Sequence, residues 1–133
     1  MPERARILII DDDEDYRTST RALLEGEDYA VLEAANGRAG LAATRKHRPD
    51  LIIVDVMMDS LSEGYSVTQA LKFLPEYRDP RPIPVLMVSS VEVDPAELFG
   101  WIGDTSAITP DAYMTKPLDI PKFLTQVREL LKR

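Results

Sequence analysis

The segment "RILIIDDDEDYR" at residues 6–17 decides the fold, because an apolar run meets a run of acids there without a spacer. Ile7 to Ile10 are all apolar, and Asp11 to Asp15 are all acidic. A short, continuous apolar run is typical of a parallel strand that is buried on both faces. Carboxylates, in contrast, need water or a cation beside them. The junction therefore predicts a buried strand whose carboxyl end opens to solvent.

Outward from this segment, short apolar runs alternate with longer amphipathic ones. We expect further strands at residues 29–34, 50–57, 83–90 and 111–116, and helices at residues 15–26, 36–48, 65–78 and 118–133. Pro75 is expected to end the third helix or to start a short new turn. The repeated strand–helix alternation predicts an α/β fold, a doubly wound parallel sheet with helices on both faces. Two glycines, two prolines and a tryptophan predict an irregular, lengthened segment at residues 91–110.

Length and composition predict a single domain over residues 1–133, without a linker or an internal repeat. The net charge of −7 argues against direct binding of nucleic acid through the overall field of the protein. The absence of cysteine excludes disulfides, thiolate metal sites and cysteine nucleophiles. No stretch has the length of a transmembrane helix or the form of a signal peptide, so we expect no membrane association and a cytoplasmic location.

The acids at the strand ends predict a metal site. In an open parallel sheet, ligands bind outside the carboxyl ends of the strands. Asp11 and Asp12 end the first predicted strand, and Asp55 lies near the end of the third. If these strands are neighbours, unit charges about 4 Å apart repel by roughly 4 kcal/mol at an effective dielectric of about 20. A compensating cation is then required, and hard oxygen ligands in an open, hydrated site suggest Mg²⁺.

Two further side chains are expected at the same edge. Ser89 ends the fourth predicted strand, and Lys116 follows the fifth in "YMTKP". A metal and an ammonium group can neutralise the equatorial oxygens of a phosphoryl group, and a hydroxyl can donate a hydrogen bond to it. This combination around one carboxylate is what phosphoryl transfer to Asp55 would require.

The ordered set of these residues resembles the receiver domain of two-component response regulators, in particular the stand-alone, chemotaxis-regulator-like type. The matching features are the acidic pair after the first strand, the aspartate ending the third, the hydroxyl after the fourth and "KP" after the fifth. The resemblance covers essentially the whole chain. It implies a flavodoxin-like five-stranded sheet with strand order 2-1-3-4-5. We expect no output domain after the last helix.

The resemblance also implies a role for each residue of the acidic cluster. Asp55 would be the phosphoacceptor. Asp11 and Asp12 would hold Mg²⁺, together with Asp55 and the backbone carbonyl of Met57. Asp13 to Asp15 are expected instead to start the first helix, where negative charge suits the N-terminal dipole.

The remaining matched residues would form the switch and its output. Ser89 would bind the phosphoryl group and move towards it, Lys116 would pair with it, and Tyr113 would be the rotating aromatic residue. The donor would be a sensor histidine kinase or a phosphotransfer protein, and a downstream protein would bind the face built from residues 91–133. The chain would be a signalling domain that only assists its own Mg²⁺-dependent phosphorylation and dephosphorylation. It would act by binding a partner, by relaying phosphate, or as a fragment of a longer protein.

Two other functions stay open, the first of them because of a departure from the family. Asp59 stands where receivers usually carry proline, and Gly64 comes one residue later than the usual glycine. The altered loop leaves room for an interaction module that keeps the fold without phosphorylation. A Mg²⁺-dependent phosphohydrolase with an aspartyl nucleophile is the enzymatic alternative. Such an enzyme usually needs a second acid two residues after the nucleophile, and Met57 stands there instead.

Overall fold

The computed structural model describes residues 4–55, 61–78, 82–89, 111–116 and 119–132, except for the side chains of residues 61–65 and 89. Its described strands are β1 (Arg6–Ile10), β2 (Ala30–Ala34), β3 (Leu51–Asp55), β4 (Val85–Ser89) and β5 (Ala112–Thr115). The described helices are α1 (Glu14–Gly26), α2 (Gly37–His47), α3 (Leu61–Phe73), α4 (Pro75–Arg78) and α6 (Ile120–Leu131). After β1, each strand begins one or two residues later than predicted.

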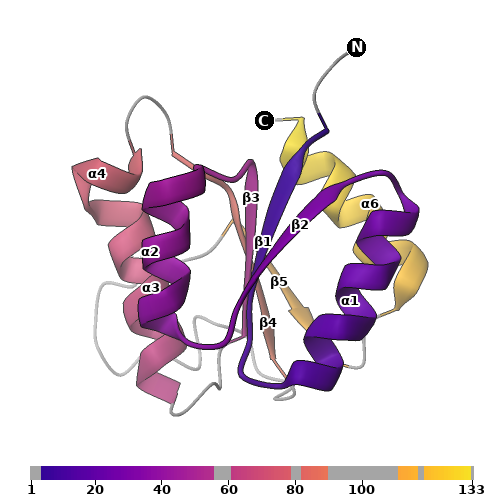
Figure 1. Cartoon of the computed structure of the whole chain (residues 1–133), viewed down its shortest axis with the longest axis horizontal. Coiled ribbons are helices and arrows are strands. Elements are labelled where there is room, and N and C mark those ends of the chain that lie inside the picture. Colours follow the sequence, from indigo (N-terminus) through magenta and orange to yellow (C-terminus); the bar gives the residue numbers. More distant parts are fainter. Residues whose placement is uncertain (1–3, 56–60, 79–81, 90–110, 117–118, 133) are drawn as a thin grey trace.

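The strands form one parallel sheet in the order β2-β1-β3-β4-β5. Helices α1 and α6 cover one face of the sheet, and α2 and α3 cover the other (Figure 1). This arrangement confirms the predicted doubly wound α/β fold and its strand order. It also makes β1 and β3 direct neighbours, which the metal-site prediction required.

Side chains of the central strands alternate between the two helical layers. Ile7 and Ile9 of β1 belong to the core layer under α1 and α6, whereas Leu8 and Ile10 belong to the layer under α3. These four side chains are fully buried. A strand covered on both faces needs apolar residues at successive positions, which explains the continuous run in the sequence.

The helix starts follow local capping chemistry. Asp13 is the N-cap of α1, and its side chain accepts a hydrogen bond from the backbone N–H of Tyr16. Asp119 caps α6 in the same way, by accepting from Lys122 N–H. The third helix begins at Leu61 rather than at residue 65 and ends at Phe73, so α4 is the short new turn that Pro75 was expected to start.

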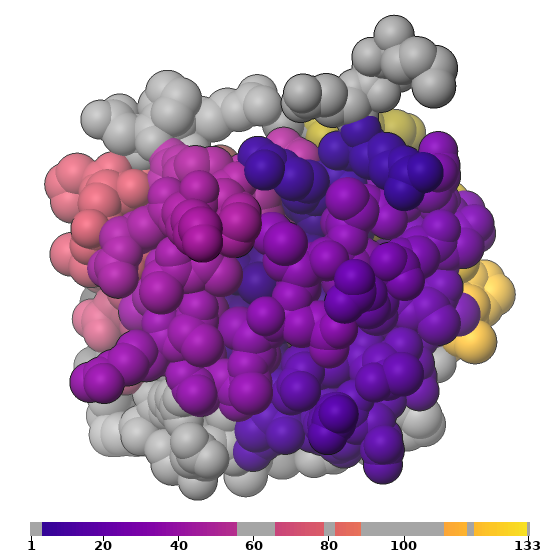
Figure 2. Space-filling model, in the orientation of Figure 1, coloured from indigo at the N-terminus to yellow at the C-terminus, as the bar shows by residue number. Residues whose placement is uncertain are grey.

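A glycine lets α2 approach the sheet closely. A Cβ atom added at Gly40 would come within 2.8 Å of Cγ1 of Ile10 in β1. One turn later, the hydroxyl of Thr44 donates back to the carbonyl of Gly40 at 2.8 Å. The outer surface of α1, β2 and α2 fills most of the face seen in Figure 2.

The predicted irregular segment at residues 91–110 lies outside the described residues, as does the loop with Met57 and Asp59. None of the helices that the structure describes is long and apolar enough to cross a membrane.

Candidate functional site

The carboxyl ends of β1, β3 and β5 bring together three of the predicted site residues. Asp11 follows the last residue of β1, Asp55 is the last residue of β3, and Lys116 follows β5. In each strand the residue two positions earlier, such as Ile9 or Ile53, packs in the core layer under α1 and α6. Because side chains repeat every second residue along a strand, all three functional groups extend from this layer.

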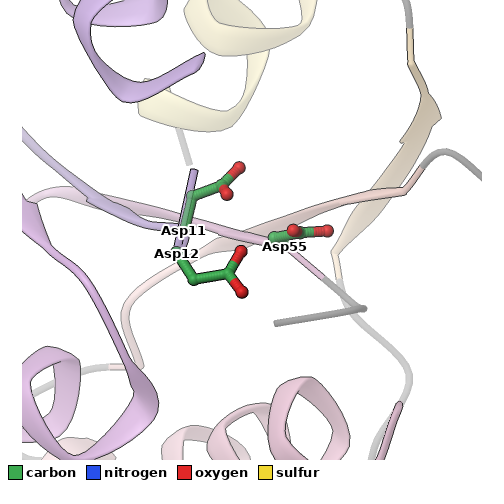
Figure 3. Close-up of side chains that lie close together, drawn as sticks. All are labelled: Asp11, Asp12 and Asp55. Carbon is green, nitrogen blue, oxygen red and sulfur yellow. The ribbon is translucent and has the colours of Figure 1, made fainter. Parts of the chain in front are cut away.

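Asp11, Asp12 and Asp55 form a compact cluster in which a carboxylate oxygen of each lies within 4.8 Å of the others (Figure 3). Asp11 is 1% and Asp55 4% exposed, whereas Asp12 is exposed. Buried carboxylates at this spacing repel one another strongly, and they require a positive charge nearby.

Lys116 supplies part of that positive charge. Its Nζ donates a hydrogen bond to Oδ2 of Asp11 at 3.1 Å and lies 3.6 Å from Oδ2 of Asp55. The lysine side chain is itself 18% exposed, so the ammonium is largely removed from solvent. One ammonium beside three carboxylates leaves two negative charges in excess, which is the charge that a divalent cation balances.

The cluster fits such a cation by the chemistry of its donors. Carboxylate oxygens are the ligands that Mg²⁺ and Ca²⁺ prefer, and Mg²⁺ keeps several of its waters when it binds. The exposed position of Asp12 leaves the cluster open on one side for a hydrated ion. The residues present can therefore hold a metal ion. The fourth predicted ligand, the carbonyl of Met57, lies outside the described residues.

The first turn of α1 is tied to the cluster through Asp11. The backbone N–H of Asp13 donates to Oδ1 of Asp11 at 2.9 Å, while Oδ2 of Asp11 accepts from Lys116. Asp13 in turn accepts from the N–H of Tyr16 at 3.1 Å. The capping residue of the helix thus fixes both the acid and the aromatic residue that follows it.

Tyr16 completes the surroundings of the lysine. The Nζ atom of Lys116 lies 3.8 Å from the centroid of the Tyr16 ring, a cation–π contact. Burial raises the pKa of Tyr16 to about 12, the Thr20 side chain opposes this rise, and the charges of Asp11 and Asp55 add to it. The tyrosine is therefore neutral at physiological pH. Its buried hydroxyl makes no well-formed hydrogen bond to a described residue, although Thr20 lies near enough to affect it.

An arginine pair holds the same helix against β2. Arg17 donates through Nη1 to the backbone carbonyl of Asp11 and through Nε to Glu33 at 3.1 Å. Arg21 donates to the other oxygen of Glu33 at 2.7 Å. Hydrogen bonds from Arg21 first, and then from Arg17, lower the pKa of Glu33 although burial raises it.

The strand register places the backbone of Ser89 at the same edge. Asp55 pairs with Val88 of β4, and the next residue, Ser89, pairs with Thr115 of β5. Ser89 therefore directly follows the residue that pairs with Asp55, and it lies beside the residue that precedes Lys116. The side chain of Ser89 is not among the described ones, so its predicted contact with a phosphoryl group stays a prediction.

Tyr113 lies within β5, paired with Met87 of β4, and is half-buried. The alternation along β5 puts it on the opposite face of the sheet from Lys116. The structure thus brings Asp11, Asp12, Asp55 and Lys116 into one site, whereas Tyr113 extends from the other face of the sheet. Its role as a switch stays a prediction.

Sequence reasoning did not single out Tyr16 or Arg17 as parts of the site. Both lie in the first turns of α1, and each contacts a residue that follows a strand. Tyr16 contacts Lys116 after β5, and Arg17 contacts Asp11 after β1. The signal that could have found them is the helix start at Asp13. A side chain three or four residues after the cap lies over the first turn, next to the strand end that precedes it.

Comparison with known proteins identifies the family. The model of the response regulator receiver domain matches residues 7–128. The chain belongs to this family and is a receiver domain of the two-component response regulators, a class of signalling domains.

Its relatives include regulators of different lengths. The chain is 38% identical over 130 residues to the DNA-binding dual master transcriptional regulator RpaA of Synechocystis, covering 96% of this chain and 49% of RpaA. It is 32% identical over 128 residues to the polar-differentiation response regulator DivK of Brucella anthropi, covering 94% of each. The chain therefore spans about half the length of RpaA and nearly all of DivK.

Solved structures agree with the family. A putative response regulator from Chloroflexus aurantiacus superposes with a TM-score of 0.82 at 25% identity, over 98% of this chain and 100% of that one. The chemotaxis response regulator CheY4 of Vibrio cholerae superposes with a TM-score of 0.79 at 26% identity, over 96% and 99% of the two chains.

Proposed function

We propose that Asp55 accepts a phosphoryl group from the phosphohistidine of a sensor histidine kinase or a phosphotransfer protein. Asp11, Asp12 and Asp55 would hold Mg²⁺ for this reaction, with the carbonyl of Met57 as a further ligand. The observation that carries the proposal is the position of Lys116. Its ammonium lies within 3.6 Å of a buried acid at the end of a central strand, inside a cluster that still carries excess negative charge.

The transfer breaks the phosphorus–nitrogen bond of phosphohistidine and forms a bond from phosphorus to a carboxylate oxygen of Asp55. The imidazole leaves with the electron pair of the broken bond and takes its proton from solvent. Phosphoryl transfer passes through a state whose charge lies on the equatorial oxygens, so catalysis consists mainly of positioning and charge neutralisation. A bound Mg²⁺ would supply part of that neutralisation.

Lys116 supplies the remainder from the protein itself. Its ammonium, which lies between the carboxylates of Asp11 and Asp55, can move its hydrogen bonds to a phosphoryl oxygen on Asp55 without leaving the site. Asp11 is suited to support the site rather than to accept the phosphoryl group, because Asp13 N–H and Lys116 already engage one of its carboxylate oxygens each. Asp12 is exposed and suited to a hydrated ion.

The proposed response to phosphorylation rests on the family rather than on the geometry of the cluster. We propose that Ser89 and Tyr113 respond to the phosphoryl group and that a downstream protein binds the face formed by residues 91–133. A cytoplasmic location is part of the same proposal.

Intact mass spectrometry after incubation with acetyl phosphate tests the phosphoacceptor. We expect one added phosphoryl group in the presence of Mg²⁺, and none after Mg²⁺ is chelated or in Asp55→Asn. Asp15→Asn is the matched control, because Asp15 is an exposed acid in the first turn of the neighbouring helix. It should be modified as fully as the wild type.

Two other results would contradict the proposal in different ways. An adduct that persists in Asp55→Asn would place the phosphoryl group on another residue. A wild-type protein that gains no adduct, either from acetyl phosphate or from a phosphorylated histidine kinase, would support the non-phosphorylated interaction module instead.

A further inference from the structure

Among the described residues, three groups lie around the ammonium of Lys116: two carboxylates and one uncharged aromatic ring. Asp11 and Asp55 approach it with carboxylate oxygens at 3.1 Å and 3.6 Å, and the ring of Tyr16 lies beneath it at 3.8 Å. A lysine side chain is long, flexible and strongly hydrated, so its orientation must be fixed by its surroundings. The face of an aromatic ring attracts a cation without itself carrying a charge.

We propose that Tyr16 is a positioning residue that holds the ammonium of Lys116 at the carboxylate cluster, where it can meet a phosphoryl group on Asp55. The holding itself is a property of the folded protein. Its consequence for phosphoryl transfer rests on the proposed function of Asp55.

The ring has an advantage over the acids as a support for the lysine. A cation that binds Asp11 and Asp55 weakens the attraction of these acids for the ammonium, and phosphorylation removes the charge of the Asp55 carboxylate itself. The attraction of the ring does not depend on the state of these acids. Tyr16 also remains uncharged over the physiological range, since burial raises its pKa to about 12.

The backbone of Tyr16, which carries the ring, is held by the same residues that form the site. The N–H of Tyr16 donates to Asp13, the N–H of Asp13 donates to Asp11, and Asp11 accepts from Lys116. With the contact between Tyr16 and Lys116, these interactions form a closed circuit of four residues. The start of α1 therefore fixes the position of Tyr16 relative to the end of β1. A side chain on a longer loop would not be fixed in this way.

Two substitutions separate the ring face from the hydroxyl group. Tyr16→Phe keeps the ring and removes the hydroxyl, whereas Tyr16→Leu removes the ring and keeps an apolar side chain. Tyr29→Leu is the matched control, because Tyr29 is a partly buried tyrosine that directly precedes β2 and packs against the core layer under α1 and α6. Denaturant unfolding of all three variants verifies that each is folded.

The first measurement is the NMR chemical shift of the Lys116 side-chain protons, which a ring beneath them moves upfield. We expect this upfield shift in the wild type, in Tyr16→Phe and in Tyr29→Leu, and its loss in Tyr16→Leu. Absence of the shift from the wild type, or its survival in Tyr16→Leu, would overturn the proposal.

The second measurement is the rate constant of phosphorylation by saturating acetyl phosphate, with the dissociation constant of Mg²⁺ measured beside it. We expect Tyr16→Leu to be about tenfold slower, which is the effect of losing one cation–π contact in a desolvated site. Its Mg²⁺ affinity should stay within about twofold of the wild type, since the contact is with the lysine and not with the metal ligands. Tyr16→Phe should restore the rate.

The outcomes distinguish this inference from the proposed function. A phosphorylated wild type with an equally fast Tyr16→Leu would overturn the positioning role and leave Asp55 as the phosphoacceptor. Equal slowing of Tyr16→Phe and Tyr16→Leu would assign the effect to the hydroxyl and overturn the role of the ring. A wild type that takes no phosphoryl group but shows the expected shifts would overturn the proposed function, while the holding of Lys116 would stand.

Discussion

Gly40 of α2 lies directly against the side chain of Ile10 in β1. A Cβ atom at position 40 would come within 2.8 Å of Ile10 Cγ1 and 3.1 Å of its Cγ2, and Ile10 is fully buried. Interiors are packed to the density of organic crystals, so the isoleucine has little space into which it can move. Asp11 follows Ile10 directly, and the same close contact therefore supports the backbone that carries the site.

Gly40→Ala should accordingly destabilise the protein, although alanine is the better helix former. We expect a loss of about 1–3 kcal/mol in the free energy of unfolding, measured by chemical denaturation, because overpacking a core has this cost. Gly26→Ala is the control, since nothing lies within 4 Å of a Cβ atom there. It should be neutral or slightly stabilising. Equal stability of both variants would show that Ile10 can adjust.

Asp12 should oppose folding without metal and favour it with metal. Removing its charge in Asp12→Asn should raise the free energy of unfolding in EDTA by about 0.5–1 kcal/mol, because repulsion by Asp11 and Asp55 is relieved. In the wild type, Mg²⁺ at 100 times its dissociation constant should add about 2.7 kcal/mol. Asp12→Asn should lose most of this gain, and Asp15→Asn should keep it. Thermal unfolding with and without Mg²⁺ measures both effects, and a full gain in Asp12→Asn would exclude Asp12 as a ligand.

Glu33 should contribute to stability only while its carboxylate is charged. Its pKa is lowered, mainly by hydrogen bonds from Arg21, so its stabilising effect is present above the ordinary value of 4.5 and disappears as pH falls through the lowered value. Glu33→Gln should therefore cost up to about 1 kcal/mol at pH 7, a limit set by its solvent exposure. The difference from the wild type should vanish once the pH falls below the lowered pKa of Glu33.

Denaturant unfolding at three pH values measures this dependence. Glu25→Gln is the comparison, because Glu25 makes only the longer contact with Arg21 at 3.3 Å on an exposed part of α1. Its effect should be smaller. An effect of Glu33→Gln that persists at low pH would indicate lost packing rather than lost charge.

The sequence predicted the sheet because a strand that is buried on both faces consists of consecutive apolar residues. Ile7 to Ile10 and Leu51 to Val54 are continuous apolar runs, and each ends in an aspartate that the structure places in one cluster. Strand order and the rule that ligands bind at carboxyl ends then sufficed to bring Asp11, Asp55 and Lys116 together. This part of the site was accessible because it depends on topology alone.

Other features depend on packing and were not accessible. The sequence could not distinguish buried Asp11 from exposed Asp12, because a one-residue step between adjacent acids carries no compositional signal. The start of α3 was placed too late, since Gly64 has a low helix propensity that the observed helix overrides. The contact of Tyr16 with Lys116 depends on how α1 lies on the sheet, and no local pattern records that.

The hydrogen bond between Lys116 and Asp11 joins residues that are 105 positions apart in the chain. Closing so long a loop has an entropic cost that only the assembled sheet can offset. During synthesis the N-terminal half emerges first, so the nascent chain carries the acids of β1 and β3 before their internal counter-ion exists. The site is completed only when β5, the last of the described strands, has been made. Unfinished or partly folded molecules therefore lack the complete site and its chemistry.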